Sequence, residues 1–184
     1  SMYLTLLLPL SVANTYTYVL PSALEDRVIV GSRVIAQFGA KRYYTSIVLA
    51  IHPNNPQPDI QLKPITDVVA QEVEFAGGIA TLHFRLLTVP EVQVLRSGLS
   101  SHDYDARADL MAWSISRSIC NPDGSQVDDE GNMLLSESDA KKLTEQAFLK
   151  LFSLVISLNI RRADSAGKSL PTNGGGTPSP SPLA

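Results

Sequence analysis

Two tyrosines at alternating positions are the first residues in the sequence whose chemistry could serve a ligand. In the stretch NTYTYVL, Tyr16 and Tyr18 are two residues apart, which places them on one face of an extended segment. A ring that is open to solvent on a strand can stack on a nucleic-acid base, whereas a ring turned inward packs a small β core. The alternation alone leaves two interpretations open: both rings pack a small core, or one of them lies exposed as a platform for a flat ligand.

Basic residues elsewhere in the first third of the chain are candidates for contacts to phosphate groups. They are Arg33, Lys41, Arg42 and Lys63. Residues 1–69 carry five basic and four acidic side chains, a balance of +1, which is weak for a nucleic-acid-binding surface. On composition alone, these charges are typical of a solvated rim. Gly39, in the sequence FGAK, can supply the positive φ of a hairpin turn.

The usual signatures of catalysis and metal binding do not assemble elsewhere in the sequence. His83 and His102 lack partners at metal-ligand spacing, and Cys120 has no basic residue on its own turn except Arg117, which is more typical of an inert thiol than of a nucleophile. The acidic run at 128–132 lacks the alternating frame of a calcium loop, and the GKS at 167–169 lacks the first glycine of a phosphate loop. We therefore expect a binding protein that is not an enzyme and has no metal site and no cofactor.

Composition and charge change along the chain and indicate two modules. Hydrophobic residues make up 44% and charged residues 18% of the sequence, which is typical of a globular protein. Residues 70–184 hold ten basic and fourteen acidic side chains, a balance of −4. The apolar run at 6–10 is too short to span a bilayer, and a single cysteine suits the reducing cytoplasm. We expect modules over 1–69 and 70–160 and a disordered tail over 161–184, with no membrane partner.

The elements that would position the tyrosines and Gly39 are short strands. Alternating or β-branched runs lie at 15–20, 27–38, 41–52 and 62–69, with turn residues between them. This spacing predicts a small, strongly bent antiparallel sheet or barrel. In the longest run, alternation places a set of five side chains on one face: Tyr43, Thr45, Ile47, Leu49 and Ile51.

The second module is expected to be mostly helical. The run GGIATLHFRLL predicts one leading strand with Arg85 turned outward, and the TVPE that follows has the pattern of a helix capping box. Further helices are expected after the caps Ser101 and Ser136, and Thr144 can begin a separate one. The predicted fold class is α+β, a small antiparallel β-barrel-like module followed by a mostly α-helical module with one leading strand.

Three segments of the first module resemble a known family. LLLPLSVANTYTYVLP, VGSRVIAQFGAKRYYTSIVLAIH and LKPITDVV, within residues 3–69, are similar to the N-terminal DNA-binding domain of the primosomal replication-restart helicase PriA. The resemblance implies a β-barrel that captures the 3′ end of a nascent strand at a stalled fork. It places Tyr16 where the family has an aromatic residue that stacks on the terminal base, and Gly39 where the backbone approaches the nucleotide. The resemblance therefore implies that Tyr16 is the exposed tyrosine and that Tyr18 packs in the core. It also matches Lys63 to the basic residue of the LKP segment, and Thr17 to a position where many members have Asp.

Residues 75–160 resemble tail assembly chaperones of long-tailed phages. The shared pattern is R-x-L-T-x-x-E, then C-[ND]-x-D-G, then L-[ST]-x-x-D-A-x-x-L, and a closing helix that ends in L-N. The resemblance implies a non-enzymatic protein that binds a phage tape-measure protein and keeps it soluble. A natural or engineered fusion would account for both resemblances in one chain. The alternative is a tail assembly chaperone whose β module does not bind DNA.

Overall fold

The computed structural model describes residues 1–11 and 14–160, so the expected tail at 161–184 lies outside the described residues. The described chain divides into two compact units between Asp67 and Val68. In the described ranges, none of the helices combines the length and the apolar character needed to cross a membrane.

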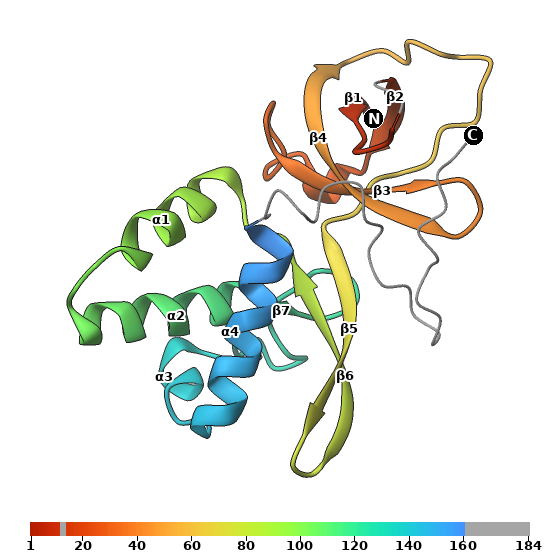
Figure 1. Ribbon diagram of the computed structural model, residues 1–184. Coiled ribbons are helices and arrows are strands. Elements are labelled where there is room, and N and C mark those ends of the chain that lie inside the picture. Colours follow the sequence, from red (N-terminus) through yellow and green to blue (C-terminus); the bar gives the residue numbers. More distant parts are fainter. Residues whose placement is uncertain (12–13, 161–184) are drawn as a thin grey trace. The chain divides into compact units, whose positions relative to one another are not determined.

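Four antiparallel strands form the sheet of the first unit (Figure 1). They are β1 (Met2–Leu7), β2 (Thr15–Leu20), β3 (Arg33–Phe38) and β4 (Arg42–His52), in the order β2-β1-β4-β3. A single turn of 3-10 helix, Ser22–Leu24, follows β2. The predicted small antiparallel sheet is confirmed.

A short segment at residues 63–66 connects the two edges of this sheet. Its backbone makes hydrogen bonds of 2.9 and 3.1 Å with Val19 on β2, and of 2.7 and 3.0 Å with Ile35 on β3. It runs parallel to β2 and antiparallel to β3. Because β2 and β3 are the outer strands of the sheet, the segment gives the unit its barrel-like form.

The core of the first unit fills the inside of this curved sheet. Its buried residues include Leu4, Leu6, Leu8, Tyr18, Leu20, Leu24, Val28, Val34, Ala36, Tyr44, Val48 and Ile65. Met2, Leu10, Tyr16, Phe38 and Ile51 are partly buried and pack against it. The core therefore draws on every strand of the sheet and on the closing segment.

A β-bulge in β4 changes which of its residues face the core. The register of β1 against β4 shifts between Thr5 and Leu6, so that Leu49 is an extra residue without a partner on β1. Ile51 packs against the core, whereas Ile47 and Leu49 are exposed. The expectation that these three side chains share a face is wrong, because a bulge moves the alternation by one residue.

The second unit combines a three-stranded sheet with four helices. The strands are β5 (Val68–Phe75), β6 (Gly78–Arg85) and β7 (Ile119–Cys120), in the order β5-β6-β7. The helices are α1 (Val89–Leu99), α2 (Tyr104–Ser118), α3 (Glu137–Ala140) and α4 (Glu145–Asn159). The expectation of one leading strand is corrected, because β5 pairs along its whole length with β6 through a tight turn at 76–77.

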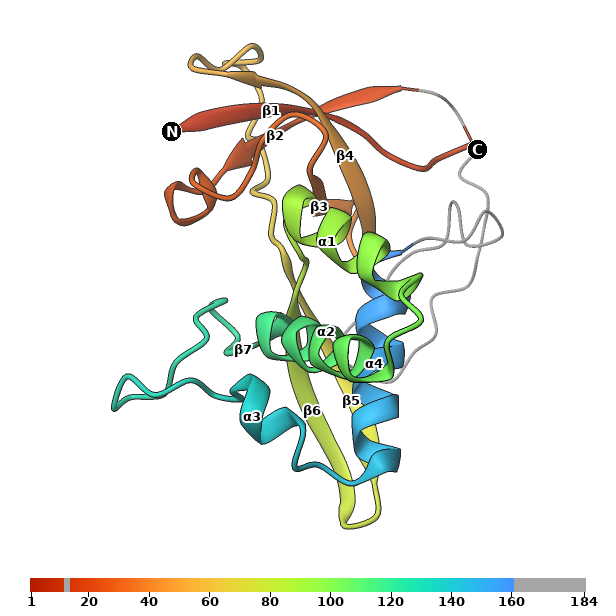
Figure 2. The same cartoon turned by 90° about the vertical axis from the view of Figure 1, so that its left-hand side faces the viewer.

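Helix α2 is the centre of the second unit, where it packs against α1, α3, α4 and β6 (Figure 2). Helix α4 buries Leu151, Val155 and Leu158. Helix α1 approaches α2 at Gly98, where an added Cβ would lie 2.3 Å from the Leu110 side chain. Glycine at this position therefore permits close packing of the two helices.

The helix caps agree with the sequence except at α2. Ser136 and Thr144 cap α3 and α4 as expected. Helix α2 is capped by Asp103 and not by Ser101, because one carboxylate oxygen of Asp103 accepts the amides of residues 105 and 106 at 2.9 and 3.1 Å. The Ser101 hydroxyl accepts the Asp103 amide at 3.2 Å and so supports the cap.

Candidate nucleic-acid interface

The two tyrosines of β2 lie on the same face of the strand, which is the inner face of the barrel. Tyr16 pairs with Leu6 and Tyr18 with Leu4, and both leucines are fully buried. The expected burial of Tyr18 is confirmed, since its exposed fraction is 5%. Tyr16, expected to be exposed, is half-buried, because it stands at the end of the strand and still faces the core.

The Tyr18 hydroxyl connects β2 to β3 across the barrel. It donates a hydrogen bond of 2.9 Å to the Gln37 carbonyl oxygen. Burial, and secondarily the neighbouring Tyr16, raises the pKa of Tyr18 to about 12. The hydroxyl is therefore protonated at neutral pH and available as a donor.

The ring of Phe38 contacts the ring of Tyr16 next to the β3–β4 turn. The two rings meet edge to face, with centroids 4.9 Å apart and an interplanar angle of 68°. Phe38 is the last residue of β3 and directly precedes Gly39. Sequence reasoning did not assign Phe38 to the site, although an aromatic residue next to a turn glycine was a visible signal.

The turn at Gly39 is held by two side chains, one from the segment 63–66 and one from β3 itself. Gly39 has φ +72°, the left-handed region that favours glycine, and no atom beyond Gly39 and its chain neighbours Phe38 and Ala40 lies within 4 Å of where a Cβ would be. The Lys63 ammonium donates to the Gly39 carbonyl oxygen at 2.7 Å, and the Gln37 side-chain amide donates to the Ala40 carbonyl oxygen at 2.8 Å. The turn thus has a defined conformation and an open side.

The structure brings together three of the four residues expected to bind a 3′ end. The Tyr16 ring contacts Phe38, which directly precedes Gly39, and the Lys63 ammonium donates to the Gly39 carbonyl oxygen. Thr17 is not part of this group. It alternates to the outer face of β2, where it pairs with Thr5.

The basic residues expected to contact phosphates divide between the two ends of the barrel. Lys41 is exposed in the turn, and Arg42 lies directly opposite Phe38 in the strand register. Arg33 begins β3, whereas Phe38 ends it, which separates their backbones by about 17 Å at the usual rise per residue. Arg33 therefore lies away from the aromatic pair.

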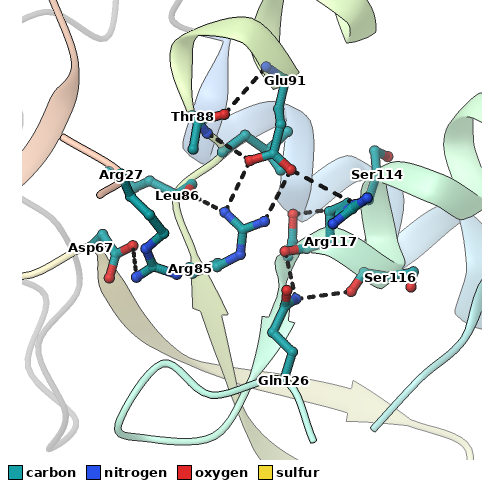
Figure 3. A network of polar contacts seen from close by, with 12 residues as sticks. Arg27, Asp67, Arg85, Leu86, Thr88, Glu91, Ser114, Ser116, Arg117 and Gln126 are labelled. Atoms are coloured by element: carbon teal, nitrogen blue, oxygen red, sulfur yellow. Dashed lines mark hydrogen bonds and ion pairs between the residues drawn. The ribbon is translucent and has the colours of Figure 1, made fainter. Parts of the chain in front are cut away.

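The acidic residues of the first unit are mostly at the end away from the turn. Residues 25–26 lie beyond the far end of β2, just after the 3-10 helix. Asp67 follows the segment 63–66, which runs in the same direction as β2, and it forms an ion pair with Arg27 (Figure 3). Asp59 is in the loop between β4 and that segment. The turn end is consequently the more basic end of the barrel.

The second unit contains a buried ion pair at the start of α1 (Figure 3). Arg85, expected to point outward, is 5% exposed and donates to the two carboxylate oxygens of Glu91 at 3.1 and 3.0 Å. Burial alone would raise the pKa of Glu91, but hydrogen bonds from Arg85 and Thr88 and the charge of Arg85 together lower it. Glu91 also completes the expected capping box with Thr88. Arg85 is buried because α1 folds back over the end of β6 and brings this carboxylate with it.

Other residues of the R-x-L-T-x-x-E and L-N patterns also stabilise the unit itself. Asn159 is fully buried, and its side chain accepts the Leu87 amide and donates to the Val155 carbonyl, both at 2.8 Å.

The Gln126 side chain donates to carbonyl oxygens at the C-terminal end of α2 (Figure 3). In the part of the chain that the structure describes, no three His, Cys, Asp or Glu side chains form a group that could hold a metal ion.

Comparison with known proteins gives a family match for the first part of the chain. The model of the PriA family described as the 3′ DNA-binding domain (3′BD) matches residues 5–85. No curated protein and no solved structure gives a significant match. The matched range contains Tyr16, Phe38, Gly39 and Lys63, and it continues through β5 and β6. These comparisons support the PriA resemblance, and they give no support to the resemblance of residues 75–160 to tail assembly chaperones.

Proposed function

We propose that the first unit binds the 3′ end of a single-stranded or forked DNA. The observation that carries this proposal is the match to a 3′ DNA-binding domain over residues 5–85. The aromatic pair and the held turn support it, because both lie at one end of the barrel within the matched range. The segments 14–18 and 37–42, which form this end, contain two basic residues and no acidic residue, and the Lys63 side chain reaches the turn at the Gly39 carbonyl oxygen.

In this proposal, the terminal base stacks on the Tyr16 ring, an interaction that is worth roughly 1–3 kcal/mol and is indifferent to base identity. The open side of Gly39 lets the nucleotide approach the backbone closely. Lys63 uses one N–H on the Gly39 carbonyl and retains further donors for a phosphate oxygen. Lys41 and Arg42 add positive charge along the path of the strand.

The role that follows is non-catalytic. Recognition of a free 3′ end would recruit the chain to stalled replication forks in the cytoplasm, as expected for replication restart. Thr17 is not required in this version of the site, since its side chain lies on the outer face of β2.

A titration with fluorescent oligonucleotides tests the proposal. The full chain is titrated with one oligonucleotide that has a free 3′ hydroxyl, one with a 3′ phosphate, and one blocked at its 5′ end. We expect the 3′ phosphate to weaken binding more than the 5′ block, because the added group must fit beside Gly39. Equal affinity for all three oligonucleotides would contradict end recognition.

For the second unit, we propose the function implied by its motifs, which is binding of a long helical client such as a phage tape-measure protein. The proposal rests on the pattern in residues 75–160 alone. Co-expression with a tape-measure segment tests it, with solubility of that segment as the measurement. A chain that solubilises the segment but binds none of the three oligonucleotides would favour the alternative, a chaperone whose β module has no DNA-binding function.

A further inference from the structure

We infer that Phe38 is a positioning residue for DNA binding, which holds the Tyr16 ring in the orientation that accepts a terminal base. The inference rests on the proposed function of the first unit. The two rings meet edge to face at 4.9 Å and 68°, and both are half-buried. Their strands, β2 and β3, are the two outer strands of the sheet and do not pair with each other. The ring contact is therefore a direct link across the end of the barrel.

Phe38 can position another residue because its own backbone is fixed. The carbonyl oxygens of residues 37, 39 and 40 each accept a hydrogen bond from a side chain. The donors are the Tyr18 hydroxyl at 2.9 Å, the Lys63 ammonium at 2.7 Å and the Gln37 amide at 2.8 Å. Three side-chain bonds within four residues give the turn one conformation, and the Phe38 ring has a fixed base.

The ring contact matters for binding because Tyr16 is at the end of its strand. A half-buried ring at such a place can leave its site by rotating about its side-chain bonds, and that freedom must be lost when a base stacks on it. The edge of one ring against the face of the other favours a single arrangement. Phe38 thus lowers the cost of ordering Tyr16 before the DNA arrives.

Variants at position 38 test this inference. Phe38→Leu keeps an apolar side chain and removes the ring, and we expect affinity for the free-3′ oligonucleotide to fall roughly twofold to tenfold, the range of an edge-to-face pair. Phe38→Tyr should restore the affinity. Ile51→Ala is the matched control for stability, because Ile51 packs against the same core from the far end of β4. It should lower the melting temperature without changing the affinity.

A double-mutant cycle with Tyr16→Leu separates positioning from direct contact. If Phe38 acts through Tyr16, Phe38→Leu should cause no further loss of affinity in the Tyr16→Leu background. Independent, additive losses would overturn the inference, as would an unchanged affinity of Phe38→Leu. In either of those cases the wild-type chain still binds the free 3′ end, so the proposed function stands. A wild-type chain that binds none of the oligonucleotides refutes the proposed function and the inference with it.

Discussion

The side chain of Asn159, the last residue of α4, is hydrogen-bonded to the backbone amide of Leu87, 72 residues earlier in the chain. The bond is 2.8 Å long, and Asn159 is fully buried. It joins the end of the closing helix to the link between β6 and α1. The two ends of the second unit's helical part are thereby held together by one amide group.

Replacement of Asn159 should destabilise the second unit, because its side chain is the acceptor of a buried backbone amide. Asn159→Ala leaves the buried Leu87 amide without its acceptor, and an unsatisfied buried group costs about 1–3 kcal/mol. Urea denaturation followed by circular dichroism measures the loss. Ser157→Ala is the matched control on the same helix, since Ser157 is exposed and its hydroxyl donates to the Leu154 carbonyl oxygen within its own turn. Equal effects of the two substitutions would contradict the assigned role of Asn159.

The Arg85–Glu91 pair should make the second unit sensitive to acid. The pKa of Glu91 is lowered from its ordinary value of 4.5, so its stabilising effect is present above that value and is lost as pH falls through the lowered one. Glu91→Gln should flatten this part of the stability profile. Arg85→Ala should cost about 3–5 kcal/mol, because it leaves a carboxylate in a partly buried place without its main partner.

Thermal melts over the acidic range measure this dependence. The control is Asp129→Asn, which removes an exposed carboxylate from the loop after β7. If Glu91→Gln and the wild-type chain lose stability in parallel as pH falls, the pair does not contribute as described.

Tyr18 should ionise only at very alkaline pH. Its pKa is raised to about 12, so the stabilising effect of the neutral phenol is complete below the ordinary value of 10.0 and is lost as pH rises through 12. Ultraviolet absorbance of tyrosinate should show a transition near pH 12 that Tyr18→Phe removes. Tyr104→Phe, at an exposed position, should leave that transition unchanged.

Lys63 and Arg33 should differ in their effect on the salt dependence of DNA binding. Lys63→Ala should flatten the plot of log affinity against log salt by about 0.7, the value for one phosphate of a single strand. Arg33→Ala should leave the slope unchanged, because Arg33 begins β3 at the end away from Gly39. A flatter slope for Arg33→Ala would show that the strand follows a different path over the barrel.

Tyr16 should contribute to binding of a free 3′ end through the face of its ring. Tyr16→Leu keeps apolar packing against Phe38 and the core but removes the stacking surface, so we expect a loss of about 1–3 kcal/mol in binding of the free 3′ end. Fluorescence anisotropy measures the affinity, and thermal melts measure the fold. Tyr3→Leu, on the outer face of β1, is the control and should leave the affinity unchanged.

Local patterns in the sequence were sufficient for the strands of the first unit and for the turn at Gly39. Alternation identified β2 and β4, and a glycine between two runs identified the turn. The bulge at Leu49 was not predictable, because it depends on how β1 pairs with β4 and not on the composition of β4. A strand's own alternation therefore gave the wrong face for part of β4.

The remaining differences concern partners that are distant in the sequence. The stretch LKPITDVV reads as one extended run, yet residues 63–66 pair with β2 and β3 whereas Val68 begins β5. Alternation placed Arg85 outward, because the carboxylate that allows its burial comes from the following helix. In the candidate site, Tyr16, Gly39 and Lys63 were proposed from family resemblance. Phe38 was missed because its contact with Tyr16 joins strands that do not pair.

The segment 63–66 has a further consequence for the first unit. Outer strands with unpaired backbone groups are templates for other chains, and proteins with such strands tend to aggregate. Here the same segment lies along both outer strands, β2 and β3. The loop that leads to this segment from β4 therefore anchors the residues that keep both outer strands from pairing with other chains. Cleavage of that loop would weaken this protection at both edges of the sheet at once, and we expect the cleaved chain to self-associate.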